Sequence, residues 1–212
     1  MTDIALQITD TWAQWWGWEL VAVILAVGYL VLAVRQNPLC WYCGFASTAI
    51  YTLLYWNVSL LMEAGLNVYY MVMAAYGWWQ WRHGGKGDTE LPVRTWPWYQ
   101  HLAVIVSVLV VSAATGTWLT YFTEAAWPYV DSFTTWAAVV TTFMVARKVL
   151  ENWLYWMVIN STAIVVLVDR ELYLTALLMG SYLVISVFGW RAWYRDYRYR
   201  DYQHREKAAQ RV

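Results

Sequence analysis

Seven apolar segments account for most of this chain, and each is close to the length needed to cross a membrane as a helix. A spanning helix needs about 20 mostly apolar residues. Only 13% of the residues are charged, against about 25% in soluble domains. The sequence therefore predicts an all-α integral membrane protein with seven transmembrane helices. Their expected ranges are 18–34, 38–56, 60–81, 98–121, 129–146, 150–168 and 172–193.

The basic residues predict the orientation of these helices. With seven spans, thirteen of the 14 Lys and Arg residues fall on one side of the membrane, and only Arg170 falls on the other. Cytoplasmic loops carry the excess of Lys and Arg, which places the N-terminus outside and the C-terminus in the cytoplasm. Residues 1–17 hold no basic residue, unlike a cleaved signal peptide, and are expected to form an extracytoplasmic segment. The basic tail, 194–212, is expected to anchor at the membrane interface rather than to bind nucleic acid.

An internal repeat predicts how the helices are organised. When the chain is shifted by 112 residues, positions 35–81 align with 147–193 without a gap, and ten of the 47 pairs are identical. We expect two three-helix repeats, 18–81 and 129–193, joined by a cytoplasmic loop at 82–97 and a linker helix at 98–121. This 3+1+3 arrangement makes the repeats parallel, which is one known transporter plan, with a site near mid-membrane and alternating access.

One stripe on the sixth expected helix is a candidate binding site. Trp153, Trp156 and Asn160 lie on one face of a helix, at i, i+3 and i+7. Hydrocarbon offers an asparagine amide no hydrogen-bond partner, so Asn160 should face protein or a ligand. Trp156 and Asn160 align with Gly44 and Thr48 and so break the repeat, as contacts to an asymmetric ligand would.

The residue types in this stripe favour a flat, positively charged aromatic solute. Indole rings stack on planar rings and attract cations, while amides hydrogen-bond to polar edges. Asn67, Tyr70 and Tyr182 are further candidates for binding the substrate, because they place an amide and two hydroxyls in the third and seventh segments. The acidic residues fall near expected helix ends, which favours facilitated diffusion over coupling to protons or sodium.

No catalytic, cofactor or metal site is expected. Cys40 and Cys43 form a C-x-x-C pair without a second pair or a neighbouring His, whereas zinc sites use three or four ligands, so we interpret them as small buried residues. The three histidines are not expected to build a site together. The lysines all fall on the cytoplasmic side, which excludes a retinal-binding protein. A receptor or scaffold without transport activity stays an alternative.

Three motifs together resemble the PnuC family of bacterial nicotinamide riboside transporters. The first is the turn R-x-N-P-L-x-W at 35–41, the second is Y-G-W-W-Q-W at 76–81, and the third is W-x-x-W-x-x-x-N at 153–160. The resemblance implies a 3+1+3 fold like that of SWEET proteins, a homotrimer in the inner membrane, and facilitated diffusion of the riboside for NAD synthesis. It also implies that a cytoplasmic kinase traps the riboside by phosphorylation.

The resemblance further implies that Trp153, Trp156 and Asn160 line the substrate site. The family often has Gln near the position of Asn67, so this asparagine is a shorter substitute. Relatives in the family carry thiamine or riboflavin and differ in the sixth-helix motif. The W-x-x-W-x-x-x-N motif argues for the riboside, and thiamine is the nearest alternative substrate.

Overall fold

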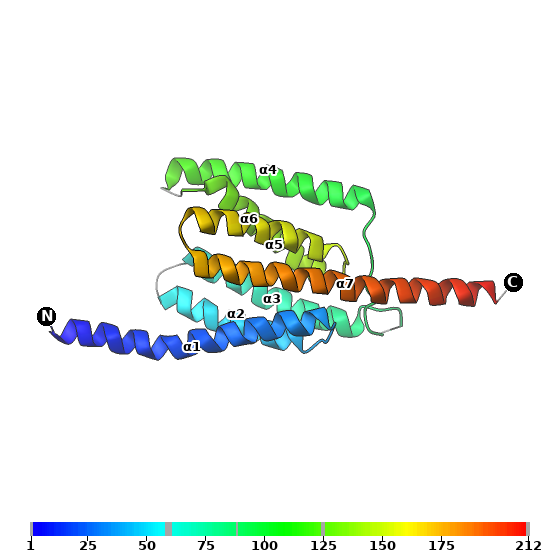
Figure 1. Ribbon diagram of the computed structural model, residues 1–212, viewed down its shortest axis with the longest axis horizontal. Helices are drawn as coiled ribbons and strands as arrows, with labels where there is room; N and C mark the ends of the chain where they lie inside the picture. Colours follow the sequence, from blue (N-terminus) through cyan, green and yellow to red (C-terminus); the bar gives the residue numbers. More distant parts are fainter. Residues whose placement is uncertain (1, 58–60, 88, 124–125, 211–212) are drawn as a thin grey trace. The chain divides into compact units, whose positions relative to one another are not determined.

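The computed structural model describes residues 2–57, 61–87, 89–123 and 126–210. Leu60, the first residue of the expected span 60–81, and Arg211, in the expected basic tail, lie outside the described residues. In the described part of the chain, the structure consists of seven helices and one isolated β-bridge (Figure 1). The helices are α1 (Thr2–Val34), α2 (Cys40–Asn57), α3 (Leu61–His83), α4 (Trp98–Phe122), α5 (Pro128–Ala146), α6 (Asn152–Asp169) and α7 (Tyr173–Ala209).

The seven helices correspond to the seven apolar segments, but two of them are longer than expected. Helix α1 begins at Thr2, and α7 continues to Ala209 through what was expected to be a tail. Neither Gly nor Pro follows Gly189 in α7, and Arg200 donates to Asp196 over 3.1 Å, an i,i+4 pair that supports a helix. Apolar length therefore indicates where a span lies and not where its helix ends.

The chain divides into two compact units, residues 1–90 and 91–212. In the first unit, α2 packs against both α1 and α3. In the second unit, α6 packs in the same way against α5 and α7, and α4 adds a further contact to α5. The order of packing within α1 to α3 is thus the same as that within α5 to α7.

The turns that open α2 and α6 have the same hydrogen bonds. The N–H of Asn37 donates to the carbonyl of Leu32, and 112 residues later the N–H of Val149 donates to that of Met144, both at 2.9 Å. Gln36 and Lys148 occupy the left-handed region, with φ of 54° and 48°. This pattern is a Schellman motif, which satisfies the last carbonyls of a helix. The sequence repeat is therefore matched by the backbone of each unit.

Four of the described helices contain a window that is long and apolar enough to cross a membrane. The windows are Gly17–Val34, Trp98–Phe122, Asn152–Asp169 and Thr175–Gln203. Helices α2 and α5 carry hydroxyl groups within their sequences, including Ser47 and Thr141, and α3 carries the amides of Asn67 and Gln80. Many of these hydroxyls donate to a carbonyl one turn back, as Thr141 does to Ala137 at 2.6 Å, so the helix itself satisfies them.

Candidate functional site

The predicted stripe on α6 combines a buried amide with one accessible indole. Asn160 is 5% exposed, and no hydrogen bond joins its side chain to the described residues. Trp156 is half-buried and packs against the apolar cluster around Val108, Ala138 and Ile159. Burying an amide without a partner is costly, so Asn160 has unused capacity to donate and accept hydrogen bonds.

Trp153 is held in the packing between α6 and α7. Its side chain is 2% exposed, and its ring meets that of Trp193 edge to face, with centroids 5.4 Å apart. A β-carbon at Gly189 would lie 2.6 Å from the indole of Trp153, so only glycine leaves room for the ring. The indole Nε1 of Trp153 is buried and has no partner among the described residues.

The first unit contains the same arrangement 112 residues earlier. Trp41 meets Trp81 edge to face at 5.3 Å, and a β-carbon at Gly77 would overlap the indole of Trp41. The Nε1 of Trp41 is also buried without a partner in the described part of the chain. Trp153 thus has a counterpart in the first unit, whereas Asn160 and Trp156 do not.

The contact between Trp153 and Gly189 fixes the register of α6 against α7. Asn160 lies seven residues after Trp153, and Tyr182 lies seven residues before Gly189. Because the two helices are antiparallel neighbours, these steps move about two turns in the same direction along the pair. Asn160 and the half-buried Tyr182 therefore lie at the same level, in the apolar part of the second unit.

The remaining candidates, Asn67 and Tyr70, lie one turn apart on α3 in the first unit. Both are half-buried. The Nδ2 of Asn67 donates to the carbonyl of Glu63 at 2.9 Å, which leaves its Oδ1 as an acceptor. The same register argument puts Tyr70 level with Thr48, because Trp41 meets Gly77. Cys40 is fully buried and Cys43 half-buried in α2, as expected for packed residues.

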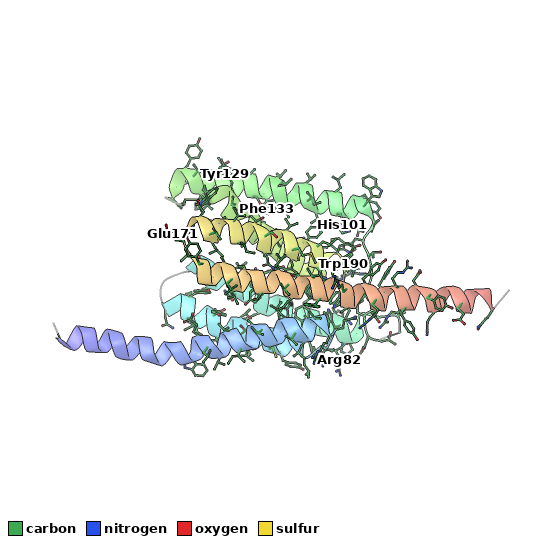
Figure 2. All side chains as sticks on the ribbon, in the orientation of Figure 1. Arg82, His101, Tyr129, Phe133, Glu171 and Trp190 are labelled. Carbon is green, nitrogen blue, oxygen red and sulfur yellow. The ribbon has the colours of Figure 1, made fainter. Side chains whose placement is uncertain are left out.

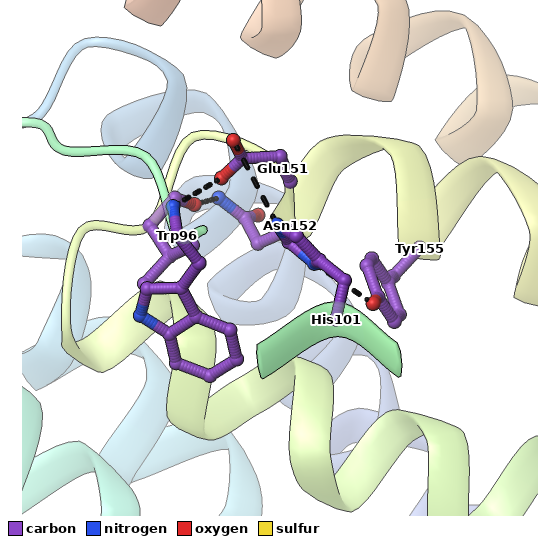
Figure 3. Close-up of polar contacts among 6 residues, drawn as sticks. Trp96, His101, Glu151, Asn152 and Tyr155 are labelled. Carbon is purple, nitrogen blue, oxygen red and sulfur yellow. Dashed lines mark hydrogen bonds and ion pairs between the residues drawn. The ribbon is translucent and has the colours of Figure 1, made fainter. Parts of the chain in front are cut away.

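A polar cluster that the sequence did not reveal lies where α4 and α6 begin (Figure 3). His101 Nδ1 is 3.0 Å from the hydroxyl of Tyr155, and His101 Nε2 is 3.9 Å from Glu151 Oε1. The backbone N–H of Trp96 donates to Glu151 Oε2 at 3.4 Å. Asn152 is fully buried beside them, with Nδ2 donating to the carbonyl of Val149 at 2.6 Å. The contacts of Glu151 with Trp96 and of Tyr155 with His101 join residues about 55 positions apart, and no local motif signals them.

This cluster closes one end of a cavity of about 460 Å³ between α4, α5 and α6. At about 100° per residue, Glu151, Tyr155 and Val158 lie on one side of α6, and Trp156 and Asn160 lie on the other. Trp156 and Asn160 therefore do not line the cavity themselves, although Trp156 packs against Val108 and Ile159 in its wall.

Comparison with known proteins identifies the family. Residues 14–195 match the profile of a family described as nicotinamide mononucleotide transporter. The chain is 22% identical over 205 residues to the nicotinamide riboside transporter PnuC of Escherichia coli, covering 85% of this chain and 84% of that one. It is 23% identical over 179 residues to the riboflavin/roseoflavin transporter RibM of Streptomyces davaonensis, covering 83% and 84%.

A solved structure shows the same fold. The crystal structure of the vitamin B3 transporter PnuC superposes with a TM-score of 0.66 at 21% identity, covering 92% of this chain and 85% of that one. The apolar helices and these relatives together define the class of the protein as a multi-pass membrane transporter. More specifically, the chain belongs to the PnuC family of nicotinamide mononucleotide and riboside transporters.

Proposed function

We propose that this protein carries nicotinamide riboside across the membrane by facilitated diffusion, supplying a precursor of NAD. The observation that carries the proposal is the buried Asn160, which has no hydrogen bond to the described residues and lies one turn from the half-buried Trp156. An amide and an indole on one face of a helix suit a flat ring that has a polar edge.

The chemistry of the riboside matches these two side chains. Its pyridinium ring carries a delocalised positive charge, which an indole face attracts by about 0.5 to 2 kcal/mol. Its carboxamide can both donate to and accept from the amide of Asn160. Trp153 packs against Gly189 and thereby fixes the position of Trp156 and Asn160 relative to α7. Tyr182, level with Asn160, and Asn67 and Tyr70 on α3 are proposed to bind the ribose hydroxyls.

We further propose that all seven helices cross the inner membrane in the 3+1+3 order, with the N-terminus outside. The matched turns at Asn37 and Val149 support a duplicated three-helix unit, and the loop charges support the orientation. The protein is proposed to act as a homotrimer, by alternating access, with a cytoplasmic kinase that traps the riboside.

A different B vitamin is the alternative substrate. Thiamine is also a cationic heteroaromatic compound, and the similar RibM of Streptomyces davaonensis is described as a riboflavin/roseoflavin transporter. Riboflavin is uncharged and larger than nicotinamide riboside, so it would gain less from an indole face. A receptor without transport activity would bind a vitamin but not move it.

Calorimetric titration of the purified protein with nicotinamide riboside, thiamine and riboflavin tests the choice of substrate. The expected result is that the riboside binds most tightly and that the other two compete weakly. Tighter binding of thiamine or riboflavin would overturn the choice of substrate. Absence of binding by all three would overturn the transport proposal itself.

A further inference from the structure

The segment that leads into α4, residues 91–97, is packed against the turn that opens α6. The backbone N–H of Leu150 donates to the carbonyl of Arg94 at 2.8 Å. Leu91 and Val93, in the same segment, are only 5% and 4% exposed. Buried side chains and paired backbone groups resist local opening, so α4 begins at a fixed place beside the start of α6.

Side chains at the start of α6 extend this contact to α4 itself (Figure 3). The hydroxyl of Tyr155 is 3.0 Å from His101 Nδ1, and Glu151 Oε2 accepts from the backbone N–H of Trp96 at 3.4 Å. Glu151 Oε1 is 3.9 Å from His101 Nε2, which is too long for a hydrogen bond, so Tyr155 makes the stronger contact with the histidine. Helix α4 therefore holds the first turns of α6 from the side.

This side contact constrains the rotation of α6 about its own axis. Trp153 packs on Gly189 toward α7, and the hydroxyl of Tyr155 is held toward α4, so α6 is fixed on two sides. Tyr155 directly precedes Trp156, and at about 100° per residue the direction of one side chain determines that of the next. The bond from Tyr155 therefore helps to set the direction in which the stripe faces.

The contact with α4 belongs to the second unit alone. Among the described helices, α2 packs against α1 and α3 and against no third helix. The positions equivalent to Glu151 and Tyr155 are Leu39 and Cys43, which carry neither a carboxylate nor a phenol. The stripe also departs from the repeat, at the residue that follows Tyr155. The polar contact and the ligand stripe are thus two departures from the repeat on one helix.

We propose that His101 and Tyr155 are positioning residues for substrate binding, because their bond holds α6 in the rotation in which Trp156 and Asn160 face the ligand. The inference rests on the proposed function, since it requires that the stripe binds the riboside. A bond that favours the binding orientation changes the affinity by no more than its own strength, which for one hydrogen bond is about three- to tenfold.

Calorimetric titration of Tyr155→Phe with nicotinamide riboside tests this role, because the variant loses the hydroxyl and keeps the ring. The expected result is weaker binding by that factor. The matched control is Tyr129→Phe, which removes a hydroxyl 3.2 Å from Thr117 Oγ1 that joins α5 to α4. Tyr129 and His101 lie toward opposite ends of α4 (Figure 2), so this control should bind as the wild type does. Weakening by both variants equally, or by neither, would overturn the inference.

Variants of His101 separate positioning from a general loss of packing. His101→Leu removes both ring nitrogens, whereas His101→Asn keeps a polar atom near the place of Nδ1. His101→Leu should weaken binding as Tyr155→Phe does, and His101→Asn should restore most of the affinity. The double variant His101→Leu, Tyr155→Phe should be no weaker than either single variant, because both changes remove the same bond. Additive losses would contradict the proposed pairing.

Alkylation of a cysteine in the stripe tests the orientation of α6 without any ligand. Trp156→Cys is combined with Cys40→Ala and Cys43→Ala, and its reaction with N-ethylmaleimide is timed in the folded protein. Adding Tyr155→Phe should raise the rate several-fold, because α6 then samples more rotations, and adding Tyr129→Phe should not. An unchanged rate with Tyr155→Phe would overturn the inference, whereas a wild type that does not bind the riboside would overturn the proposed function alone.

Discussion

The indole of Trp153 lies directly against the backbone of Gly189, so that a β-carbon at position 189 would lie 2.6 Å from the ring. This contact joins α6 to α7 at the level where the candidate stripe starts. Any substrate contact by Trp156 or Asn160 depends on it, because it fixes the register of the helix that carries them.

Replacing Gly189 with Ala should destabilise the protein. The added methyl group overlaps the ring of Trp153, and overpacking of this kind typically costs about 1 to 3 kcal/mol. Thermal unfolding in detergent, followed by circular dichroism, should show a lower midpoint. The matched control is Gly180→Ala on the same helix, where no atom lies within 4 Å of the new carbon. A midpoint lowered equally by both variants would refute the contact as the cause.

The two tryptophans of the stripe should respond differently to truncation. Trp153 is 2% exposed and packed on Trp193, so Trp153→Ala should lower the free energy of unfolding by about 3 to 5 kcal/mol. Trp156 is half-buried, so Trp156→Ala should mainly weaken riboside binding. Chemical unfolding and calorimetry on both variants separate the effects. If Trp156→Ala bound the riboside as the wild type does, Trp156 would be a packing residue only.

Asn160→Leu should abolish riboside binding and leave the fold intact. Leucine keeps the volume but removes the amide that is proposed to pair with the carboxamide of the ligand. Because the amide has no hydrogen bond to the described residues, its loss should not lower the unfolding midpoint. Asn57→Leu, at an exposed helix end, is the matched control and should bind normally. Calorimetry that gave the same affinity for Asn160→Leu and the wild type would exclude this role.

Much of the fold could be predicted from sequence because long apolar segments indicate directly where the helices of a membrane protein lie. All seven helices lie where apolar segments predicted them. The longer α7 was not predicted, since helix ends outside the apolar region depend on local pairs such as Asp196 with Arg200.

The candidate site was predictable only in part. The stripe from Trp153 to Asn160 follows from helical spacing, because all its members share one helix. The cluster of His101, Glu151 and Tyr155 joins α4 to α6. Such a contact depends on how two helices pack against each other, and the spacing of residues within one helix does not predict it. The interpretation of the histidines considered only whether they form a site with one another, and so it missed the contacts of His101 with a carboxylate and a phenol.

Transport should not respond to an ion gradient. Asp131 and Asp169 lie near the ends of α5 and α6, where they contact Arg170 and Trp127, and neither is at the centre of a span. Initial uptake of labelled riboside into vesicles whose membrane potential is held at zero should therefore be the same with and without an imposed proton or sodium gradient. Accumulation above the outside concentration when either gradient is applied would show coupled transport instead.

Uptake of labelled nicotinamide riboside by proteoliposomes, with no gradient and no kinase, tests the central claim most directly. The wild-type protein should bring the inside concentration to that outside, faster than in protein-free vesicles, and Asn160→Leu should reduce the rate to that of the protein-free vesicles. A wild-type rate no higher than that of protein-free vesicles would contradict the proposal that this protein carries the riboside.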